Sequence, residues 1–502
     1  MVVGGKPWPT ILPSRQRAVL SHARRRTVAV DLTTLALGAT LLAWPSFGWP
    51  LTSLDESVLL VYAEQVRAGL VPHRDFFTVY GPAPFYLLAT LFAGFGSSLG
   101  VERALGLALH LAIALGCYGV GRSRDRTTAL LAGAASLVLL APLGTVPYAW
   151  LGAMACLALA LAMVGKHTRH AGLAAGVLAG LGPAFRPELL VVVVPVLLPY
   201  LWRCSRWRWI ASGLALGLAP LGGFSLAAGT RMWWNIGPGR AGVNGAMSLL
   251  DDPVRSVAIL ASVLGVTSTL VWLAWKRRSR ASMSHALLAL GILPQTLQRV
   301  DPDHALYTLC VTVPLVIVVG ATADRSADAL RRRKMLAAAM AVAFVGGLAA
   351  MVLRPSPATV TVRFQDRSAI VAASELPDLT ATRTELLRHA PPGGSLFVGS
   401  SDMSTVSLSR IIVYYLLPEL RPRAYFLELA VGVSERAGSG LVNDVRNADV
   451  LLLTRMPDGL MRQLYPYLPP GSDEANEVVR REFCPVSETG WGMLYQHRPC
   501  TN

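Results

Sequence analysis

The sequence has few cysteines and lacks the short motifs that mark many soluble enzymes. Its 6 cysteines are scattered over 502 residues. No pair has the CxxC spacing of a structural zinc site. The polar C-terminal part shows no catalytic triad, zinc site or phosphate-binding loop. It therefore offers no catalytic motif of its own.

Charged residues are also scarce, at 15% of the chain, whereas 53% of residues are hydrophobic. Uncharged runs at 127–143, 209–227, 256–275 and 335–353 approach the roughly 20 apolar residues that a bilayer-spanning helix needs. We therefore predict a polytopic membrane protein. The net charge of +16 does not indicate a nucleic-acid partner, because Lys and Arg form short clusters between apolar runs, as topology signals do.

The first apolar run, 28–49, follows a basic N-terminal segment, 1–27. A cleaved signal peptide would have a shorter apolar region and a small-residue cleavage site, and this run has neither. We interpret it as an uncleaved first span. Ten further spans are predicted, which makes 11 in a transmembrane region 28–353: 102–120, 127–143, 148–164, 171–183, 189–202, 209–227, 256–275, 284–297, 305–322 and 335–353.

The distribution of basic residues predicts the orientation. Lys and Arg cluster in those connections that lie on the same face of the membrane as the N-terminus. The positive-inside rule then places the N-terminus in the cytoplasm and everything after about residue 354 outside the plasma (inner) membrane. Most acidic residues of the connections fall on the external side. We therefore expect the chemistry on the external face.

The pair Asp55–Glu56 follows the first span directly and opens a long external loop, 50–101. Carboxylates beside apolar spans are rare and usually mark a substrate or proton site. The alternative is that the pair only caps the next helix.

Two helices are expected in that loop. Residues 57–69 have the pattern of an amphipathic helix. Residues 85–95 are apolar but too short to cross, so they are expected to lie along the interface. Treating 85–101 as a tilted span instead would reverse every later orientation and contradict the distribution of basic residues.

Three further places carry charges next to spans. The turn 298–304 contains Arg299, Asp301 and His304. One interpretation is a local Arg–Asp pair that closes the turn. The other is that Arg299 and His304 bind an anionic headgroup while an Asp orients a hydroxyl or a metal. Arg186 and Glu188 form a weaker case of the same kind, with a single salt bridge as the alternative. In loop 228–253, where Trp233 and Trp234 are expected as interfacial anchors, Arg240 lies among glycines and is a candidate phosphate ligand.

The C-terminal part, 354–502, is expected to be an extracytoplasmic soluble α/β domain. If it is exported, Cys484 and Cys500 could form a disulfide. Strands are predicted at 395–398, 425–429, 449–453 and 491–496, and helices at 404–416, 441–447 and 476–483.

The residues Asp55–Glu56, Tyr62 and the stretch GLVPHRDFFTVYGPAPFYLL (Gly69 to Leu88) resemble polytopic glycosyltransferases of the GT-C superfamily. The chain looks most similar to the bacterial dolichyl-phosphate-mannose-mannosyltransferase-like and aminoarabinose-transferase-like groups. Those enzymes carry an acidic pair in the first external loop, a Pro-rich turn and juxtamembrane helices. The similarity covers the layout of about residues 25–330. Where members often have Lys-Pro-Pro, this chain has Gly81–Pro82–Ala83–Pro84.

The resemblance implies an all-α membrane fold, a sugar donor on a polyprenyl phosphate in the outer leaflet, and a cell-envelope glycan or glycolipid acceptor. Such a transfer needs a carboxylate to take the acceptor proton and cations to stabilise the departing phosphate. A single displacement would invert the anomeric configuration. A divalent metal is left open as a cofactor. The predicted base is Asp55, supported by Glu56 or Asp75, and the predicted substrate ligands are Arg299, His304, Asp301, Arg240, Arg186 and Tyr80.

Two other functions are weighed. A lipid-linked-sugar transporter or flippase would place charges near the middle of the bilayer or show repeated halves, and the sequence shows neither. A non-catalytic envelope scaffold has only the C-terminal part in its favour.

Overall fold

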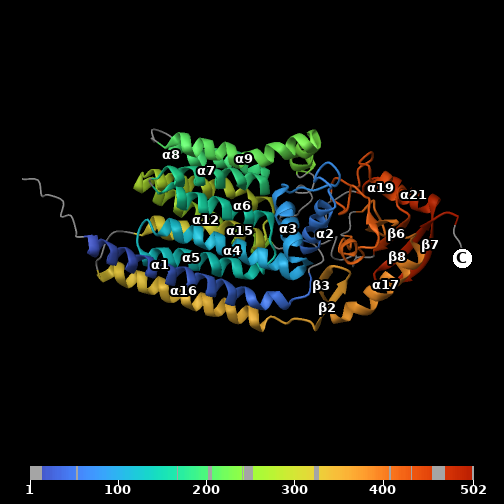
Figure 1. Ribbon diagram of the computed structural model, residues 1–502, viewed down its shortest axis with the longest axis horizontal. Helices are drawn as coiled ribbons and strands as arrows, with labels where there is room; N and C mark the ends of the chain where they lie inside the picture. The colour runs from blue at the N-terminus through green and yellow to red at the C-terminus, as the bar shows by residue number, and fades with distance from the viewer. Residues whose placement is uncertain are drawn as a thin grey trace, which may run out of the picture.

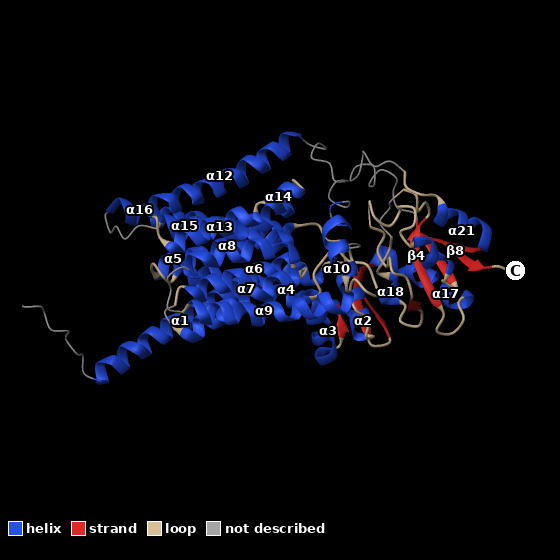
Figure 2. Ribbon diagram, turned by 90° about the horizontal axis from the view of Figure 1, so that it is seen from above, coloured by secondary structure: helices blue, strands red, loops and turns tan. Residues whose placement is uncertain are grey.

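The computed structural model describes residues 14–51, 55–166, 168–201, 206–239, 241, 253–321, 327–405, 409–430, 432–454 and 470–499. The molecule is elongated, with a bundle of helices at one end and a mixed α/β part at the other (Figure 1). Helices α2 and α3 lie between the two (Figure 2).

Each predicted span coincides with a helix. The span predicted at 284–297 divides at Pro294 into α13 and the short α14 (Pro294–Gln298). Within the described residues, six helical segments are long and apolar enough to cross a membrane. The mostly helical membrane fold is thus confirmed, while the count of 11 crossings stays a prediction. The other bundle helices are α1 (Ser14–Ala43), α4 (Leu99–Gly121), α5 (Arg126–Leu140), α6 (Ala149–Val164), α7 (Arg169–Phe185), α8 (Leu190–Leu201), α9 (Trp207–Ala228), α12 (Pro253–Arg277), α13 (Arg280–Ile292), α15 (Pro302–Gly320) and α16 (Ala327–Leu353).

Small residues let two of these helices touch through their backbones. A Cβ added at Gly176 of α7 would meet the carbonyl oxygen of Ile210 in α9, and one added at Gly213 of α9 would meet that of Leu173 in α7. Glycine at such contacts allows the close approach that drives helix pairing in a bilayer. The end of α7 that carries Arg186 is thereby held in place.

Both helices expected in the external loop are present, as α2 (Asp55–Arg67) and α3 (Ala83–Phe95). The exposed polar face expected for the first of them is absent, because α2 is buried from Glu56 to Gln65. On one side the ring of Tyr62 packs against Phe76 and Phe85, with centroids 4.7 and 5.2 Å away. On the other, the C-terminal part covers the helix.

The described residues of the C-terminal part form two sheets. In the smaller one, of order β1-β3-β2, strand β1 comes from the membrane region and pairs in parallel with β3, while β2 is antiparallel to β3. In the larger one, of order β5-β4-β6-β8-β7, β4 is parallel to β5 and β6. The bounds are β1 (Ser97–Ser98), β2 (Thr359–Phe364), β3 (Arg367–Ala372), α17 (Leu376–His389), β4 (Ser395–Ser400), α18 (Val413–Leu416), β5 (Arg421–Pro422), α19 (Leu441–Arg446), β6 (Val450–Thr454), α21 (Glu474–Glu482), β7 (Phe483–Thr489) and β8 (Gly492–His497).

Much of this part follows the prediction. Strands at 395–398, 449–453 and 491–496 and helices at 441–447 and 476–483 are confirmed, whereas the hairpin β2–β3, α17 and β7 were not predicted. The strand at 425–429 is wrong, because this segment is irregular. Of the helix at 404–416, the described residues form only α18. Cys484 is disulfide-bonded, and its expected partner Cys500 lies outside the described residues.

The membrane region and the C-terminal part make direct contacts in addition to their chain connection. Besides the β1–β3 pairing, the backbone N–H of Leu51 donates to the carbonyl of Ile370 (2.7 Å), and Arg367 forms an ion pair with Glu64 of α2 (3.2 Å). One hydrophobic core runs from α2 and α3 into β4 and β6. The position of α2, and of the carboxylates at its start, therefore depends on the C-terminal part.

Candidate active site

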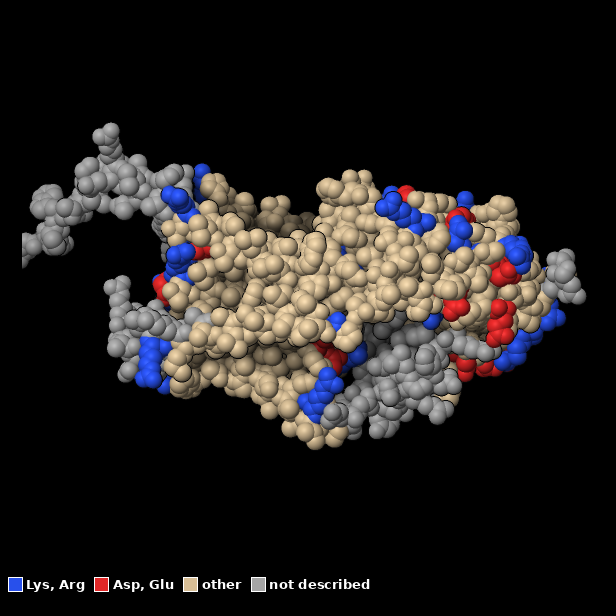
Figure 3. Space-filling view, turned by 90° about the horizontal axis from the view of Figure 1, so that it is seen from below, with Lys and Arg blue, Asp and Glu red and all other residues tan. Residues whose placement is uncertain are grey.

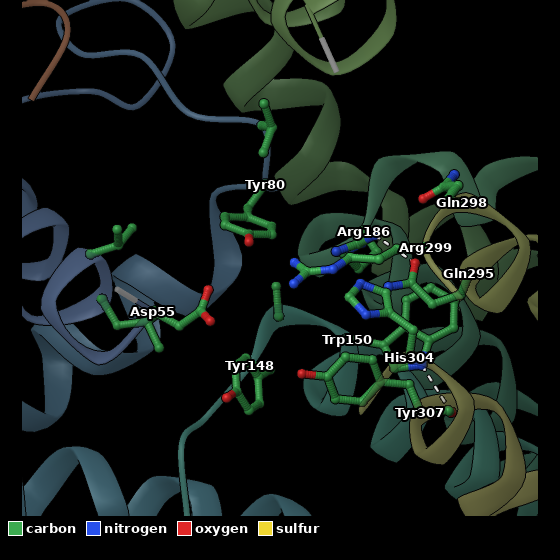
Figure 4. Close-up of a pocket in the computed structure, with 14 residues that line it drawn as sticks. Asp55, Tyr80, Tyr148, Trp150, Arg186, Gln295, Gln298, Arg299, His304 and Tyr307 are labelled. Atoms are coloured by element: carbon green, nitrogen blue, oxygen red, sulfur yellow. Dashed lines mark hydrogen bonds between the residues drawn. The ribbon is translucent and has the colours of Figure 1, made fainter. Parts of the chain in front are cut away.

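A cavity of about 150 Å³ lies at the end of the bundle that faces the C-terminal part. Five regions meet there: the start of α2, the turn before α3, the start of α6, the end of α7 and the α14–α15 connection. In Figure 4 the Asp55 carboxylate is on one side, and Arg186, Arg299, His304 and Gln295 gather opposite it. The cavity is lined by Asp55, Val58, Leu59, Val79, Tyr80, Tyr148, Ala149, Trp150, Arg186, Gln295, Gln298, Arg299, His304 and Tyr307.

Asp55 supplies the negative side of the cavity. It occupies the first turn of α2, where the partial positive charge of a helix N-terminus favours an anion. Burial nevertheless raises the pKa of Asp55 above its ordinary value of 3.8, and the charges of Arg299 and His304 oppose that shift only in part. A carboxylate with a raised pKa is a better proton acceptor at neutral pH.

Asp301 organises the positive side. It caps α15 by accepting the backbone N–H of His304 (2.8 Å), and it contacts the His304 ring through Nδ1 (2.9 Å). It also pairs with Nε of Arg299 (2.6 Å). Burial acts to raise the pKa of Asp301, but the His304 contacts and the Arg299 charge outweigh it and lower the pKa. The local Arg–Asp pair thus exists, and Arg299 still lines the cavity.

Arg186 is the buried cation of the site, with 3% of its surface exposed. Its Nε donates to Glu188 (2.6 Å) and its Nη2 donates to the side-chain oxygen of Gln295 (2.9 Å). The guanidinium lies 5.7 Å from the ring centroid of Tyr80 and 5.2 Å from that of Trp150. The Arg186–Glu188 salt bridge is therefore present, and Arg186 also lines the cavity.

Glu56 does not line the cavity, although it is adjacent to Asp55. It forms a two-pronged ion pair with Arg103 of α4 (2.8 and 3.1 Å), and both side chains are almost fully buried. Arg103 also donates to the carbonyls of Ser46 and Trp49 (2.8 and 2.7 Å). The structure thus gives Glu56 an anchoring position, not the expected place beside the base.

Replacing Arg103 with Met is expected to destabilise the protein by roughly 3–5 kcal/mol, because it leaves the Glu56 carboxylate buried without its partner. Thermal unfolding of the full chain in detergent measures the effect. The exposed pair Arg74–Asp75 provides the control, since Arg74→Ala should leave the unfolding midpoint nearly unchanged. Equal midpoints for the Arg103 and Arg74 variants would contradict the anchoring position of Glu56.

Asp75 does not line the cavity. Asp75 pairs with Arg74 (2.8 Å) and accepts the backbone N–H of Val71 (2.7 Å). The Arg74 contact lowers the pKa of Asp75. Asp75 thus stabilises its own turn. Arg240 lies outside the described residues. Tyr80, by contrast, lines the cavity as expected.

Sequence reasoning missed the aromatic and amide side chains of the site. Trp150 donates its indole N–H to the carbonyl of Tyr307 (3.0 Å), and the ring of Tyr148 lies 5.5 Å from that of Tyr307. Gln295 and Gln298 complete the lining. Gln295 and Gln298, at the end of the span predicted at 284–297, could have indicated a polar site there, because amides inside a membrane need hydrogen-bond partners.

The residues present do not fit a divalent metal. Across the described ranges, no three His, Cys, Asp or Glu side chains are close enough to share an ion. The cavity instead offers two arginines and a histidine opposite Asp55. The positive charge that faces Asp55 therefore comes from protein side chains.

No family model matches the sequence, and no curated protein matches it significantly. Two solved structures of ArnT from Cupriavidus metallidurans match nearly the whole chain. The one bound to undecaprenyl phosphate has a TM-score of 0.55 at 13% identity and covers 93% of this chain and 98% of its own. The apo structure has a TM-score of 0.52 at 12% identity and covers 94% and 98%.

This chain shares its fold with the two ArnT structures. The likeness extends over both the helical bundle and the C-terminal part. Because the sequence identity is so low, the likeness to ArnT concerns the fold alone. The chemistry of this chain depends on the side chains of its own cavity.

Proposed function

We propose that the protein is an inverting membrane glycosyltransferase that transfers a sugar from a polyprenyl-phosphate donor to a hydroxyl of a cell-envelope glycan or glycolipid. Asp55 takes the proton of the acceptor hydroxyl as its oxygen attacks the anomeric carbon. The bond to the donor phosphate breaks in the same displacement. Arg299, Arg186 and His304 hold the phosphate that leaves.

The observation that carries the proposal is the separation of charge in one cavity, with Asp55 on one wall and two arginines and a histidine on the other. An in-line displacement needs its base and its leaving-group ligands on opposite sides of the reacting carbon. Undecaprenyl phosphate bound to the ArnT structure supports a polyprenyl-phosphate ligand for this fold.

The distribution of charge supports an extracytoplasmic site in the inner membrane. On the face shown in Figure 3, basic side chains gather at the end of the bundle away from the C-terminal part, and a broad uncharged belt separates them from the mixed charges of that part. Under the positive-inside rule the basic end is cytoplasmic. The cavity and the C-terminal part are then outside.

The pH profile tests the role of Asp55. The base acts when deprotonated, so transfer should fall as the pH drops through a pKa above the ordinary 3.8. In Arg299→Ala the acid limb should move to still higher pH, because the charge that lowers this pKa is lost. A limb at the same pH in both proteins would contradict the assignment.

The transfer assay tests the function itself. Membranes that contain the protein are given a panel of radiolabelled polyprenyl-phosphate sugars, and label in the glycan and glycolipid fractions is counted. Transfer from at least one donor is expected. If the protein only moves lipid-linked sugars between leaflets, label stays on the lipid and the transporter alternative replaces this proposal.

A further inference from the structure

Gln295 is an uncharged side chain among the charged groups of the cavity. It is the second residue of α14 and only 5% exposed. It lines the cavity on the wall that also carries Arg186, opposite Asp55 (Figure 4). The transfer step described above gives it no part. A buried amide costs free energy unless its oxygen and its nitrogen both find hydrogen-bond partners.

The amide oxygen of Gln295 is committed to Arg186, whose Nη2 donates to Oε1 (2.9 Å). A guanidinium has only donors, so the amide must turn its oxygen toward it and direct its N–H bonds elsewhere. Within the described residues the amide nitrogen has no hydrogen-bond partner, and it is not sealed off from the cavity. The contact with Arg186 thus makes Gln295 an N–H donor toward the cavity.

Arg186 also keeps one donor for a ligand. Its Nε donates to Glu188 (2.6 Å) and its Nη2 to Gln295, whereas Nη1 has no partner in the part of the chain that the structure describes. The nearby rings of Tyr80 and Trp150 restrict the guanidinium further. Glu188, Arg186 and Gln295 are thus a chain of fixed side chains that leaves N–H donors at Arg186 and Gln295.

The helix that carries Gln295 is itself fixed to α15. The hydroxyl of Thr296 donates to the carbonyl of His304 (3.0 Å) and contacts the hydroxyl of Thr308 (2.9 Å). Thr296 and Thr308 are both fully buried. The Gln295 amide and the His304 ring therefore keep their positions relative to each other in the cavity wall.

We propose that Gln295 is a further ligand of the leaving phosphate, and that its amide N–H group and the remaining donor of Arg186 contact the same phosphate group. The inference rests on the proposed function, which supplies the phosphate. The amide adds a donor without adding charge, and Arg186 orients it before the substrate arrives. Donors oriented in advance need no reorganisation when negative charge develops.

The charge on the phosphate increases during the transfer. A phosphate that links a sugar to a polyprenol carries one negative charge. When the bond between the anomeric carbon and the phosphate oxygen breaks, the electron pair stays on that oxygen, and the acceptor proton goes to Asp55. The phosphate leaves with one more negative charge. A donor fixed beside it therefore stabilises the transition state more than the bound substrate.

Binding of undecaprenyl phosphate tests the assignment without requiring transfer. The full chain in detergent is titrated with the radiolabelled lipid and, separately, with uncharged undecaprenol. In Gln295→Met the phosphate affinity should fall about 10- to 150-fold, the effect of losing a hydrogen bond to a charged group. Gln295→Glu keeps an oxygen for Arg186 but faces the phosphate with a negative charge, so its affinity should fall further. Undecaprenol binding should stay unchanged in both variants, which shows that they are folded.

Gln365→Glu is the matched control, because it makes the same change at an exposed position in the turn between β2 and β3. It should bind undecaprenyl phosphate as the unmodified protein does. If Gln295→Glu binds the lipid as tightly as Gln295→Met or more tightly, Gln295 serves only as the partner of Arg186, and the proposal is overturned. A loss smaller than tenfold in Gln295→Met would overturn it as well.

Kinetics separate this inference from the proposed function. In Gln295→Met the kcat of sugar transfer should fall by a larger factor than the donor KM rises, and the reverse would overturn the proposal. If the variants bind the lipid in the expected order but the unmodified protein transfers no sugar, the proposed function is refuted and Gln295 remains a phosphate ligand. If transfer occurs and the Gln295 variants bind the lipid as the unmodified protein does, only the inference falls.

Discussion

Replacing Asp55 with Asn is expected to lower sugar transfer by about 10²- to 10⁴-fold, the range that a general base contributes. The amide has nearly the same shape but cannot take the acceptor proton. Donor binding should survive, because the arginines lie on the opposite wall. The measurement is transfer from a labelled polyprenyl-phosphate sugar, with undecaprenyl phosphate binding and the unfolding temperature recorded for the same preparation.

Asp75→Asn is the matched control for this change. It makes the same substitution in the same external loop, in a carboxylate that pairs with Arg74 and does not line the cavity. Its transfer rate should stay close to that of the unmodified protein. An equal loss in both variants would show that the loss comes from a disturbed loop and not from a missing base.

Replacing Arg299 with Ala is expected to weaken binding of undecaprenyl phosphate and to raise the donor KM about 10- to 150-fold. Hydrogen bonds to charged groups contribute about 1.5–3 kcal/mol each, and Arg186 and His304 remain to hold the phosphate. The acceptor KM should change little. Equilibrium binding of the radiolabelled lipid and steady-state kinetics measure the two effects separately.

Two further variants sharpen the result. Arg299→Lys keeps the charge but loses the planar fork that grips a phosphate, so it should recover only part of the affinity. Arg74→Ala removes an exposed arginine outside the cavity and should leave lipid binding unchanged. If Arg299→Ala binds the lipid as well as the unmodified protein, Arg299 serves only its pair with Asp301.

The membrane helices could be predicted because burial in lipid demands long uncharged runs, and these are visible without tertiary information. The break at Pro294 inside a predicted span was also encoded locally, since proline interrupts a helix. The burial of α2 could not be predicted. It depends on the C-terminal part, whose contact with the loop is set by residues some 300 positions away, such as Arg367 and Ile370.

The candidate site shows the same division. Asp55 and Arg299 could be identified because charges beside apolar spans stand out. The different positions of Asp55 and Glu56 could not be predicted. Neighbouring residues on a helix point about 100° apart, and only the position of Arg103 in the folded protein shows that Glu56 is the anchored one.

The most direct test of the central claim is an electron cryo-microscopy structure of the full chain in lipid nanodiscs with undecaprenyl phosphate. The account predicts phosphate density inside the cavity, about 3 Å from the guanidinium groups of Arg299 or Arg186, with the Asp55 carboxylate facing it across the gap. Lipid phosphate bound elsewhere while the cavity stays free of it would contradict the account.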